Sequence, residues 1–217
     1  MTKILGIDEA GRGPAIGPMI IAGVMINEGD ENLLVGSKDS KMLVHKVRMI
    51  LDKKIKENST YKIIEVNPKE IDDALNSKKN NLNWLEAQKQ AEIINSLNPD
   101  KAVIDCPSVN IISFKNYLRN LLNNKEIELI VEHKADQNYI TCSAASILAK
   151  VRREEKINEI KNEYGDIGSG YPSDPKTKEF IKNNYSNRPE IFRHSWATLK
   201  KLSENQKKFP KNRHLCL

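Results

Sequence analysis

The chain has 217 residues, of which 39% are hydrophobic and 29% charged, and this length suffices for one large globular domain that folds without disulfide or metal support. Its longest apolar run, residues 19–26, is far shorter than the roughly 20 residues of a membrane-spanning helix, so we expect no membrane association. A strand pattern begins at residue 3, which leaves no room for a signal peptide, and the three cysteines show no CxxC spacing. We therefore expect a cytoplasmic protein without a disulfide framework or a cysteine zinc site.

The formal net charge of +6 comes from one end of the chain. Residues 193–217 contain seven basic residues and one acid, whereas residues 1–192 contain basic and acidic residues in equal number. A basic segment of this kind favours an anionic partner such as a nucleic acid. The rest of the chain carries no net charge and has to be examined site by site.

Strand and helix patterns alternate along the chain. Apolar and β-branched runs predict five strands, at residues 3–8, 19–27, 61–66, 101–105 and 127–132. Helical patterns predict a helix from Ser40, its cap, to residue 58, and others at 68–74, 82–97, 111–122, 138–164, 176–184 and 197–207. The first two strands are expected to form a hairpin, and the small residues 143–146 to pack closely against another element.

This alternation predicts an α/β fold of three layers, with a mixed five-stranded sheet flanked by helices. We expect residues 1–185 to form this body and residues 186–217 to form a small, basic, helical extension. A monomer is the default expectation.

Acidic side chains stand at the ends of three predicted strands. Asp8 and Glu9 end the first strand, Asp105 ends the fourth, and Asp136 follows the fifth by a few residues. Such strand ends converge at one edge of an α/β sheet, where ligands bind, although a single acid at a strand end is more often a helix cap or turn former. Grouped carboxylates repel one another unless a cation binds them, and a site without His or Cys favours Mg²⁺ or Mn²⁺.

A Gly-Arg-Gly segment lies directly beside the first two acids. Gly11 and Gly13 let the backbone approach a ligand, and Arg12 adds a guanidinium that binds phosphate or sugar oxygens. The alternative is an ordinary glycine-rich hairpin turn. The segment is neither a Walker loop nor a complete dinucleotide-binding motif. These residues by themselves predict metal-dependent chemistry on phosphate and no more.

Seven segments together resemble the motifs of type 2 ribonuclease H (RNase HII) in its single-chain archaeal form. They occur in the family's order between residues 4 and 198, and Glu154 stands where the family usually has Asp. The segments are GIDEAGRGP at 6–14 with GP at 17–18, DSKML at 39–43, ID at 104–105, HKAD at 133–136, SAASILAKVRR at 143–153, GSGYPSDP at 168–175 and RHSWAT at 193–198. Type 3 enzymes share the fold but differ after Asp-Glu and carry an extra N-terminal domain.

The resemblance implies an RNase H-like fold and cleavage of the RNA strand of RNA/DNA hybrids. It also implies cleavage on the 5′ side of ribonucleotides embedded in duplex DNA, leaving 3′-hydroxyl and 5′-phosphate ends, with a role in ribonucleotide excision and RNA primer removal. Asp8, Glu9, Asp105 and Asp136 are the implied ligands of two Mg²⁺ or Mn²⁺ ions.

The same resemblance assigns substrate contacts. Residues Gly11, Arg12 and Gly13 are implied to recognise the ribose 2′-hydroxyl through backbone and side-chain contacts, since this group distinguishes RNA from DNA. Tyr171 is implied to hold that ribose and to stack on the adjacent deoxyribose. Lys41 and Lys150 match positions that bind backbone phosphates, with a plain surface lysine as the alternative for each.

Other residues have simpler interpretations. His133 precedes the fourth acid and is expected to be structural, while Trp84 and Trp196 are expected to be packing residues. Residues 206–212 begin like a peptide that binds a sliding clamp, with an apolar residue three positions after Gln206, but lack the closing aromatic pair. A sliding clamp is thus a weakly supported partner of the C-terminus.

Two alternative functions compete with this ribonuclease. Another nuclease of the RNase H fold, such as a junction resolvase, would use similar acids but ignore the 2′-hydroxyl. A non-catalytic nucleic-acid-binding protein would need no metal and would depend mainly on its basic tail. The complete set of four acids argues against a non-catalytic binding protein.

Overall fold

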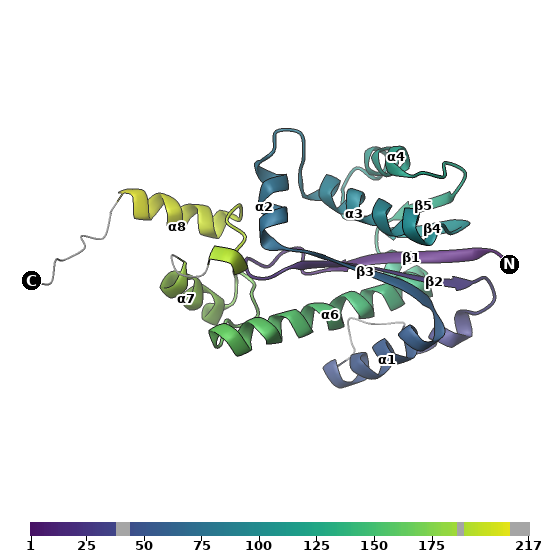
Figure 1. Cartoon of the computed structure of the whole chain (residues 1–217), viewed down its shortest axis with the longest axis horizontal. Helices are drawn as coiled ribbons and strands as arrows, with labels where there is room; N and C mark the ends of the chain where they lie inside the picture. Colours follow the sequence, from purple (N-terminus) through teal and green to yellow (C-terminus); the bar gives the residue numbers. More distant parts are fainter. Residues whose placement is uncertain (38–43, 186–188, 209–217) are drawn as a thin grey trace, which may run out of the picture.

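The computed structural model describes residues 1–37, 44–185 and 189–208, and its centre is a five-stranded mixed sheet (Figure 1). The strand order is β3-β2-β1-β4-β5. Strands β1, β2 and β3 are antiparallel neighbours, whereas β4 and β5 run parallel to β1. The strands are β1 Lys3–Ala10, β2 Met19–Asn27, β3 Thr60–Val66, β4 Lys101–Asp105 and β5 Glu128–Glu132. The expected hairpin and the expected mixed sheet are confirmed.

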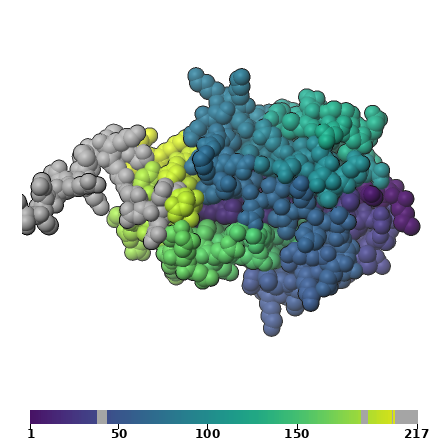
Figure 2. All heavy atoms as spheres, viewed as in Figure 1, coloured from purple at the N-terminus to yellow at the C-terminus, as the bar shows by residue number. Residues whose placement is uncertain are grey.

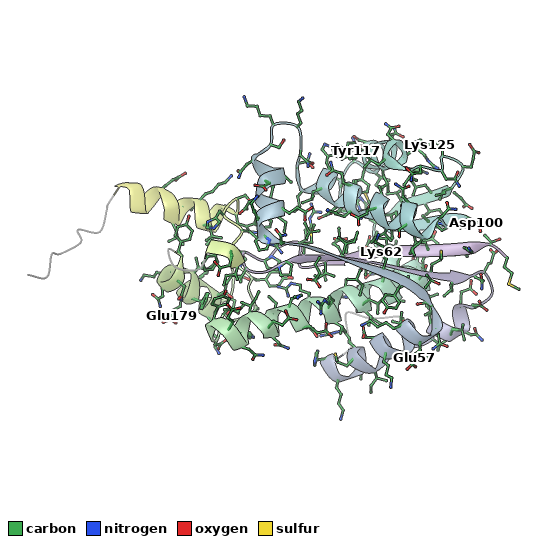
Figure 3. The ribbon with its side chains drawn as sticks, in the orientation of Figure 1. Glu57, Lys62, Asp100, Tyr117, Lys125 and Glu179 are labelled. Atoms are coloured by element: carbon green, nitrogen blue, oxygen red, sulfur yellow. The ribbon has the colours of Figure 1, made fainter. Side chains whose placement is uncertain are left out.

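Three helices cover one face of the sheet, namely α2 Pro68–Asn76, α3 Leu82–Leu97 and α4 Ile111–Leu121 (Figure 1). Their apolar side chains pack against alternate residues of the strands, including Leu5 and Ile7 of β1. Asparagine side chains cap all three helices and fix where they begin. Between α3 and α4, Gln88 donates a hydrogen bond of 2.8 Å to the hydroxyl of Tyr117, which Figure 3 labels.

The opposite face is covered by α1 His45–Asn58 and by the long helix α6 Ile140–Tyr164. A Cβ atom at Gly6 would lie 2.2 Å from the Cys142 amide nitrogen, so only glycine permits this approach of α6 to β1. The expected close packing of residues 143–146 is confirmed, because all four are buried. Helix α1 begins at His45, later than expected, and no side chain caps it; Ser40 lies outside the described residues.

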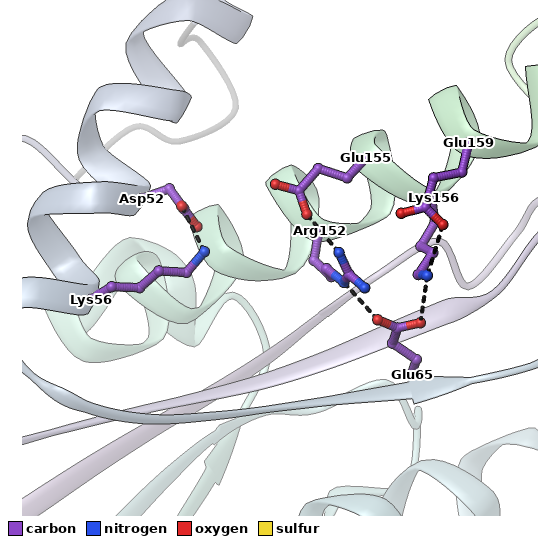
Figure 4. A network of polar contacts seen from close by, with 7 residues as sticks. All are labelled: Asp52, Lys56, Glu65, Arg152, Glu155, Lys156 and Glu159. Carbon is purple, nitrogen blue, oxygen red and sulfur yellow. Dashed lines mark hydrogen bonds and ion pairs between the residues drawn. The ribbon is translucent and has the colours of Figure 1, made fainter. Parts of the chain in front are cut away.

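Salt bridges connect α6 to the edge strand β3 (Figure 4). Arg152 donates to Glu65 at 2.6 Å, and Lys156 lies 3.5 Å from the other carboxylate oxygen of Glu65. Both pairs are solvent-exposed in part, so each contributes on the order of 0–1 kcal/mol to stability. They help to fix the direction in which α6 leaves the sheet.

The C-terminal part packs at the end of the sheet where β1 finishes. It contains α7 Pro175–Asn184, a short 3₁₀ turn at Pro189–Ile191 and α8 Ala197–Lys208. Another 3₁₀ turn, Glu31–Leu34, lies elsewhere in the fold, after β2. Ile16, in the loop after β1, forms a β-bridge with Phe192 and joins a third apolar cluster together with Leu199. In Figure 2 the yellow atoms of α8 and the yellow-green atoms of α7 lie at the same end of the molecule. The domain boundary at residue 186 stays a prediction.

The described segments 1–37, 44–185 and 189–208 contain no helix that combines the length and apolar content needed to cross a membrane.

Candidate active site

Three carboxylates meet at the ends of β1, β4 and β5. Asp8 and Asp105 lie at neighbouring positions because β1 and β4 are parallel and pair up to Ile7 and Ile104. Asp136 is in the short helix α5 Ala135–Asn138, whose first amide donates to Asp105 at 3.3 Å. One oxygen atom from each of the three acids lies within 4.8 Å of the others. The predicted convergence is therefore found for these three acids.

The environment of Asp8 disfavours its ionised form. Its side chain is buried, and burial together with the charges of Asp105 and Asp136 raises its pKa to about 6. A hydrogen bond from Ser146 of α6 opposes this shift. Three carboxylates this close repel one another, so a cation in their midst would favour their ionised forms. An all-oxygen donor set of this kind suits a hard divalent ion.

Glu9 lies beside the three acids but points to the other face of the sheet. Successive residues of a strand alternate in direction, so Asp8 faces Ser146 of α6, while Glu9 faces Glu86 of α3. One Glu9 oxygen is buried and has no hydrogen-bond partner among the described residues. Burial raises the pKa of Glu9 well above its usual range, and the charges of Glu86 and Asp8 raise it further. The cluster of three acids does not include Glu9.

The Arg12 side chain also turns toward α3. Its guanidinium forms an ion pair with Glu86, which has no exposed surface, and donates to Asn83 at 2.6 Å. Burial raises the pKa of Glu86 to about 7 even though the Arg12 charge opposes this shift. In this structure the Arg12 guanidinium is thus engaged by the protein, and the backbone of residues 11–13 lines the adjacent pocket.

That pocket has a volume of about 270 Å³ and brings most of the predicted substrate-binding residues together. The lining residues are Glu9, Ala10, Gly11, Arg12, Gly13, Lys150, Arg153, Glu154 and Tyr171. A Cβ atom at Gly13 would lie 3.4 Å from the Tyr171 ring, and the Arg153 guanidinium lies 5.2 Å from the centre of that ring. Lys41 lies outside the described residues.

A larger cavity of about 620 Å³ lies at the opposite ends of β1 and β4, where Ile4 and Lys101 line it. It contains none of the predicted acids and is mostly apolar. The small pocket is the better candidate site because Glu9, the residue after Asp8, lines it together with cationic side chains and a glycine-rich backbone.

The residues with simpler interpretations make the following contacts. The Nδ1 atom of His133 lies 3.1 Å from the carbonyl oxygen of Cys106, a contact that fits the structural role expected for this residue. Trp84 stacks near Phe114 and Tyr117 in the core, as expected of a packing residue. Trp196 also packs against the core, but its indole N–H donates in addition to the Gly13 carbonyl at 2.9 Å.

Residues 5–199 match the sequence model of the family described as Ribonuclease HII. The chain belongs to the ribonuclease HII family. The protein named Ribonuclease HII from Methanococcus maripaludis strain C7 is 49% identical over 208 residues, which cover 92% of this chain and 86% of that protein. The crystal structure of the ribonuclease H2 from Pyrococcus horikoshii OT3 is similar with a TM-score of 0.87 and 40% identity, covering 95% of this chain and 100% of that chain.

A second similar structure is that of the PCNA:RNase HII complex from Archaeoglobus fulgidus. It has a TM-score of 0.80 and 37% identity, and the match covers 89% of this chain and 94% of that chain. The RNase H-like fold expected from the motifs is confirmed by these neighbours, and membership of the ribonuclease HII family makes the chain a ribonuclease H enzyme.

Several buried polar and charged groups were not predicted from the sequence. Glu86 and Gln90 are fully buried polar residues in α3, and they lie on the same helical face as Leu82, Ile93 and Leu97. Polar residues within an apolar stripe were the available signal for a buried polar site. Arg153 and Arg193 belong to motifs that were recognised, but no role followed from the motifs for either residue.

Proposed function

We propose that this ribonuclease H is a divalent-metal-dependent endonuclease that acts on RNA/DNA hybrids and on single ribonucleotides embedded in duplex DNA. It would cut on the 5′ side of the ribonucleotide at RNA–DNA junctions and leave 3′-hydroxyl and 5′-phosphate ends. The observation that supports this most strongly is the combination of two features: the cluster of Asp8, Asp105 and Asp136, and a pocket that is lined by Glu9, the residue after Asp8, together with the glycine-rich loop and Tyr171.

The acids fit a role as ligands of Mg²⁺ or Mn²⁺. Asp8, Asp105 and Asp136 offer hard oxygen donors within 4.8 Å of one another, and Glu9 would complete the set of catalytic acids from the end of the same strand. Bound divalent ions would activate the attacking water and stabilise the leaving 3′ oxygen. The Ser146 hydroxyl favours the ionised form of Asp8, which is the form that binds a cation.

The pocket fits a ribose at a junction between RNA and DNA. The backbone of Gly11, Arg12 and Gly13 would donate to the 2′-hydroxyl, the one group that separates a ribonucleotide from a deoxyribonucleotide. Tyr171 is 40% exposed and faces this loop, so its ring is available to stack on the neighbouring deoxyribose. Lys150 lines the same pocket and would bind a backbone phosphate; Lys41 is proposed for a second phosphate from its motif alone.

A role in ribonucleotide excision and RNA primer removal follows from this substrate class. The similarity to a chain solved as a PCNA:RNase HII complex supports a sliding clamp as a partner of this protein as well. Part of the segment predicted to bind such a clamp, residues 209–212, lies outside the described residues. We further propose that the protein acts as a monomer, with residues 1–185 as the catalytic domain.

The experiment that tests this function replaces Asp136 with Asn. Asp136→Asn is expected to abolish cleavage of an RNA/DNA hybrid, because it removes one charge from the carboxylate cluster, while hybrid binding persists through the pocket. Asp73→Asn is the matched control, since Asp73 is exposed on α2 and pairs only with Lys69 among the described residues. Cleavage by Asp136→Asn at the wild-type rate would refute the proposal.

A further inference from the structure

The carbonyl groups of the Gly-Arg-Gly loop are all bound by one distant segment of the chain. Arg193 donates to the carbonyl of Gly11 at 2.7 Å and to that of Arg12 at 2.9 Å. Trp196 donates from its indole to the carbonyl of Gly13 at 2.9 Å. Residues 193–196 are part of the RHSWAT motif, to which neither the cleavage chemistry nor the substrate contacts described above give a role.

All three kinds of N–H group of the Arg193 guanidinium are used to bind carbonyls of this loop. The Arg193 side chain is completely buried, yet no acid among the described residues forms an ion pair with it. Its third donor, Nε, binds the carbonyl of Gly17 at 2.9 Å, at the other end of the same loop. A guanidinium presents its N–H groups in a rigid planar arrangement, so one Arg can bind three carbonyls that a flexible lysine could not bind together.

The segment that carries Arg193 and Trp196 is itself fixed in place. Asp72 of α2 accepts hydrogen bonds of 2.8 Å from the amides of His194 and Ser195, and one of 2.5 Å from the Ser195 hydroxyl. The Arg193 guanidinium also lies 4.9 Å from the centre of the Trp196 ring. The donors are thus held rigidly opposite the loop.

These contacts determine which way the loop amides point. In a trans peptide the N–H group points opposite to the preceding C=O group. Because the carbonyls of Gly11 and Arg12 face Arg193, the amides of Arg12 and Gly13 face the other way. In the described part of the chain neither amide has an acceptor. Two donors are therefore presented together beside the pocket that these residues line.

We propose that Arg193 and Trp196 are positioning residues that fix the Gly-Arg-Gly loop with its amides toward the ribose 2′-hydroxyl, so that the C-terminal segment determines the discrimination between RNA and DNA. This inference rests on the proposed function. It separates two roles within the C-terminal region: residues 193–196 act on specificity through the loop, while the lysines beyond them act on general affinity for nucleic acid.

Trp196→Phe is the most informative variant, because it removes the indole donor and keeps an aromatic ring. The matched control is Trp84→Phe, which makes the same change at a tryptophan whose ring packs against Phe114 and Tyr117, whereas the Gly13 carbonyl is bound by Trp196. Binding is measured in EDTA, to prevent cleavage, on a DNA duplex with one ribonucleotide and on its all-DNA twin. The ratio of the two affinities measures recognition of the 2′-hydroxyl.

The wild type is expected to prefer the ribonucleotide duplex. Trp196→Phe should reduce this preference about 3- to 10-fold, the value of one hydrogen bond, with unchanged affinity for the all-DNA twin. Arg193→Lys should reduce it further, since a lysine replaces three donors at fixed positions, and thermal unfolding checks that this variant is folded. Trp84→Phe should keep the wild-type ratio.

Equal ratios for Trp196→Phe, Trp84→Phe and the wild type would overturn the inference and leave the proposed function intact. A wild-type protein that binds both duplexes equally would instead overturn the recognition of the 2′-hydroxyl on which the inference rests.

Discussion

Asp8→Asn should stabilise the metal-free protein while it destroys activity. Asp8 is 6% exposed and has two other acids as neighbours, so ionising it in the folded state is costly. Asparagine has nearly the same shape and no charge to bury. Catalysis needs the negative charge of Asp8, whereas the metal-free folded state is more stable with a neutral side chain at this position. The variant therefore separates the two effects.

The magnitude follows from the pKa. Burial and the neighbouring acids raise the pKa of Asp8 from 3.8 to about 6, which corresponds to about 3 kcal/mol at about 1.4 kcal/mol per unit. Because the folded pKa lies above the unfolded one, this cost is absent below pH 3.8, grows up to pH 6 and is constant above it. Since Asn also weakens the Ser146 hydrogen bond, we expect a net gain of about 1–3 kcal/mol, or roughly 3–9 °C in Tm.

Thermal unfolding in EDTA tests this at pH 7.5 and again at the lowest pH at which both proteins stay folded. The Tm advantage of Asp8→Asn should be largest at pH 7.5 and should shrink as the pH falls. Added Mg²⁺ or Mn²⁺ should raise the Tm of the wild type more than that of the variant, because the ion binds the folded carboxylates. A variant less stable than the wild type at pH 7.5 in EDTA would refute this account of the Asp8 environment.

Three further predictions concern the loop, the helix and the tail. Gly11→Ala should lower kcat/KM more than 10-fold and the Tm by several degrees, because Gly11 has a φ of 80° and an added Cβ would lie 2.5 Å from Arg153 Cδ. Steady-state cleavage and thermal unfolding measure the two effects, and a wild-type kcat/KM would contradict the prediction. Ser146→Ala should raise the Mg²⁺ concentration for half-maximal activity at pH 7, because the pKa of Asp8 would rise further, and the difference should narrow at pH 9; a pH-independent difference would exclude this cause. Removal of residues 209–217, which carry two basic residues, should raise KM more than it lowers kcat. It should also reduce the slope of log K against log [salt] for duplex binding by about 2. An effect on kcat alone would argue against phosphate contacts by the tail.

Local patterns predicted the elements of this fold well. The helix Leu82–Leu97 and the strand Lys101–Asp105 have the predicted bounds, since an asparagine cap and an apolar stripe mark the helix and a short apolar run marks the strand. The helix that ends at Asn58 was expected to begin after Ser40 but begins at His45. Val44, the residue directly before His45, supplies no capping side chain, so no cap marks the start of this helix.

The site was only partly predictable. Strand ends indicated the convergence of Asp8, Asp105 and Asp136, because parallel neighbours bring their last residues together. The separation of Glu9 from this cluster follows from the alternation of side chains along a strand. Arg193, in contrast, binds a loop about 180 residues away in the sequence, and such a contact leaves no periodic pattern in either segment.

The most direct test of the account is cleavage mapping on a DNA duplex with one ribonucleotide, compared with its all-DNA twin, in Mg²⁺ and in EDTA. The account predicts a single cut on the 5′ side of the ribonucleotide, with a 5′-phosphate on the downstream product, and no cut in the all-DNA duplex or in EDTA. Cleavage of the all-DNA twin at a comparable rate, or cleavage that persists in EDTA, would contradict it.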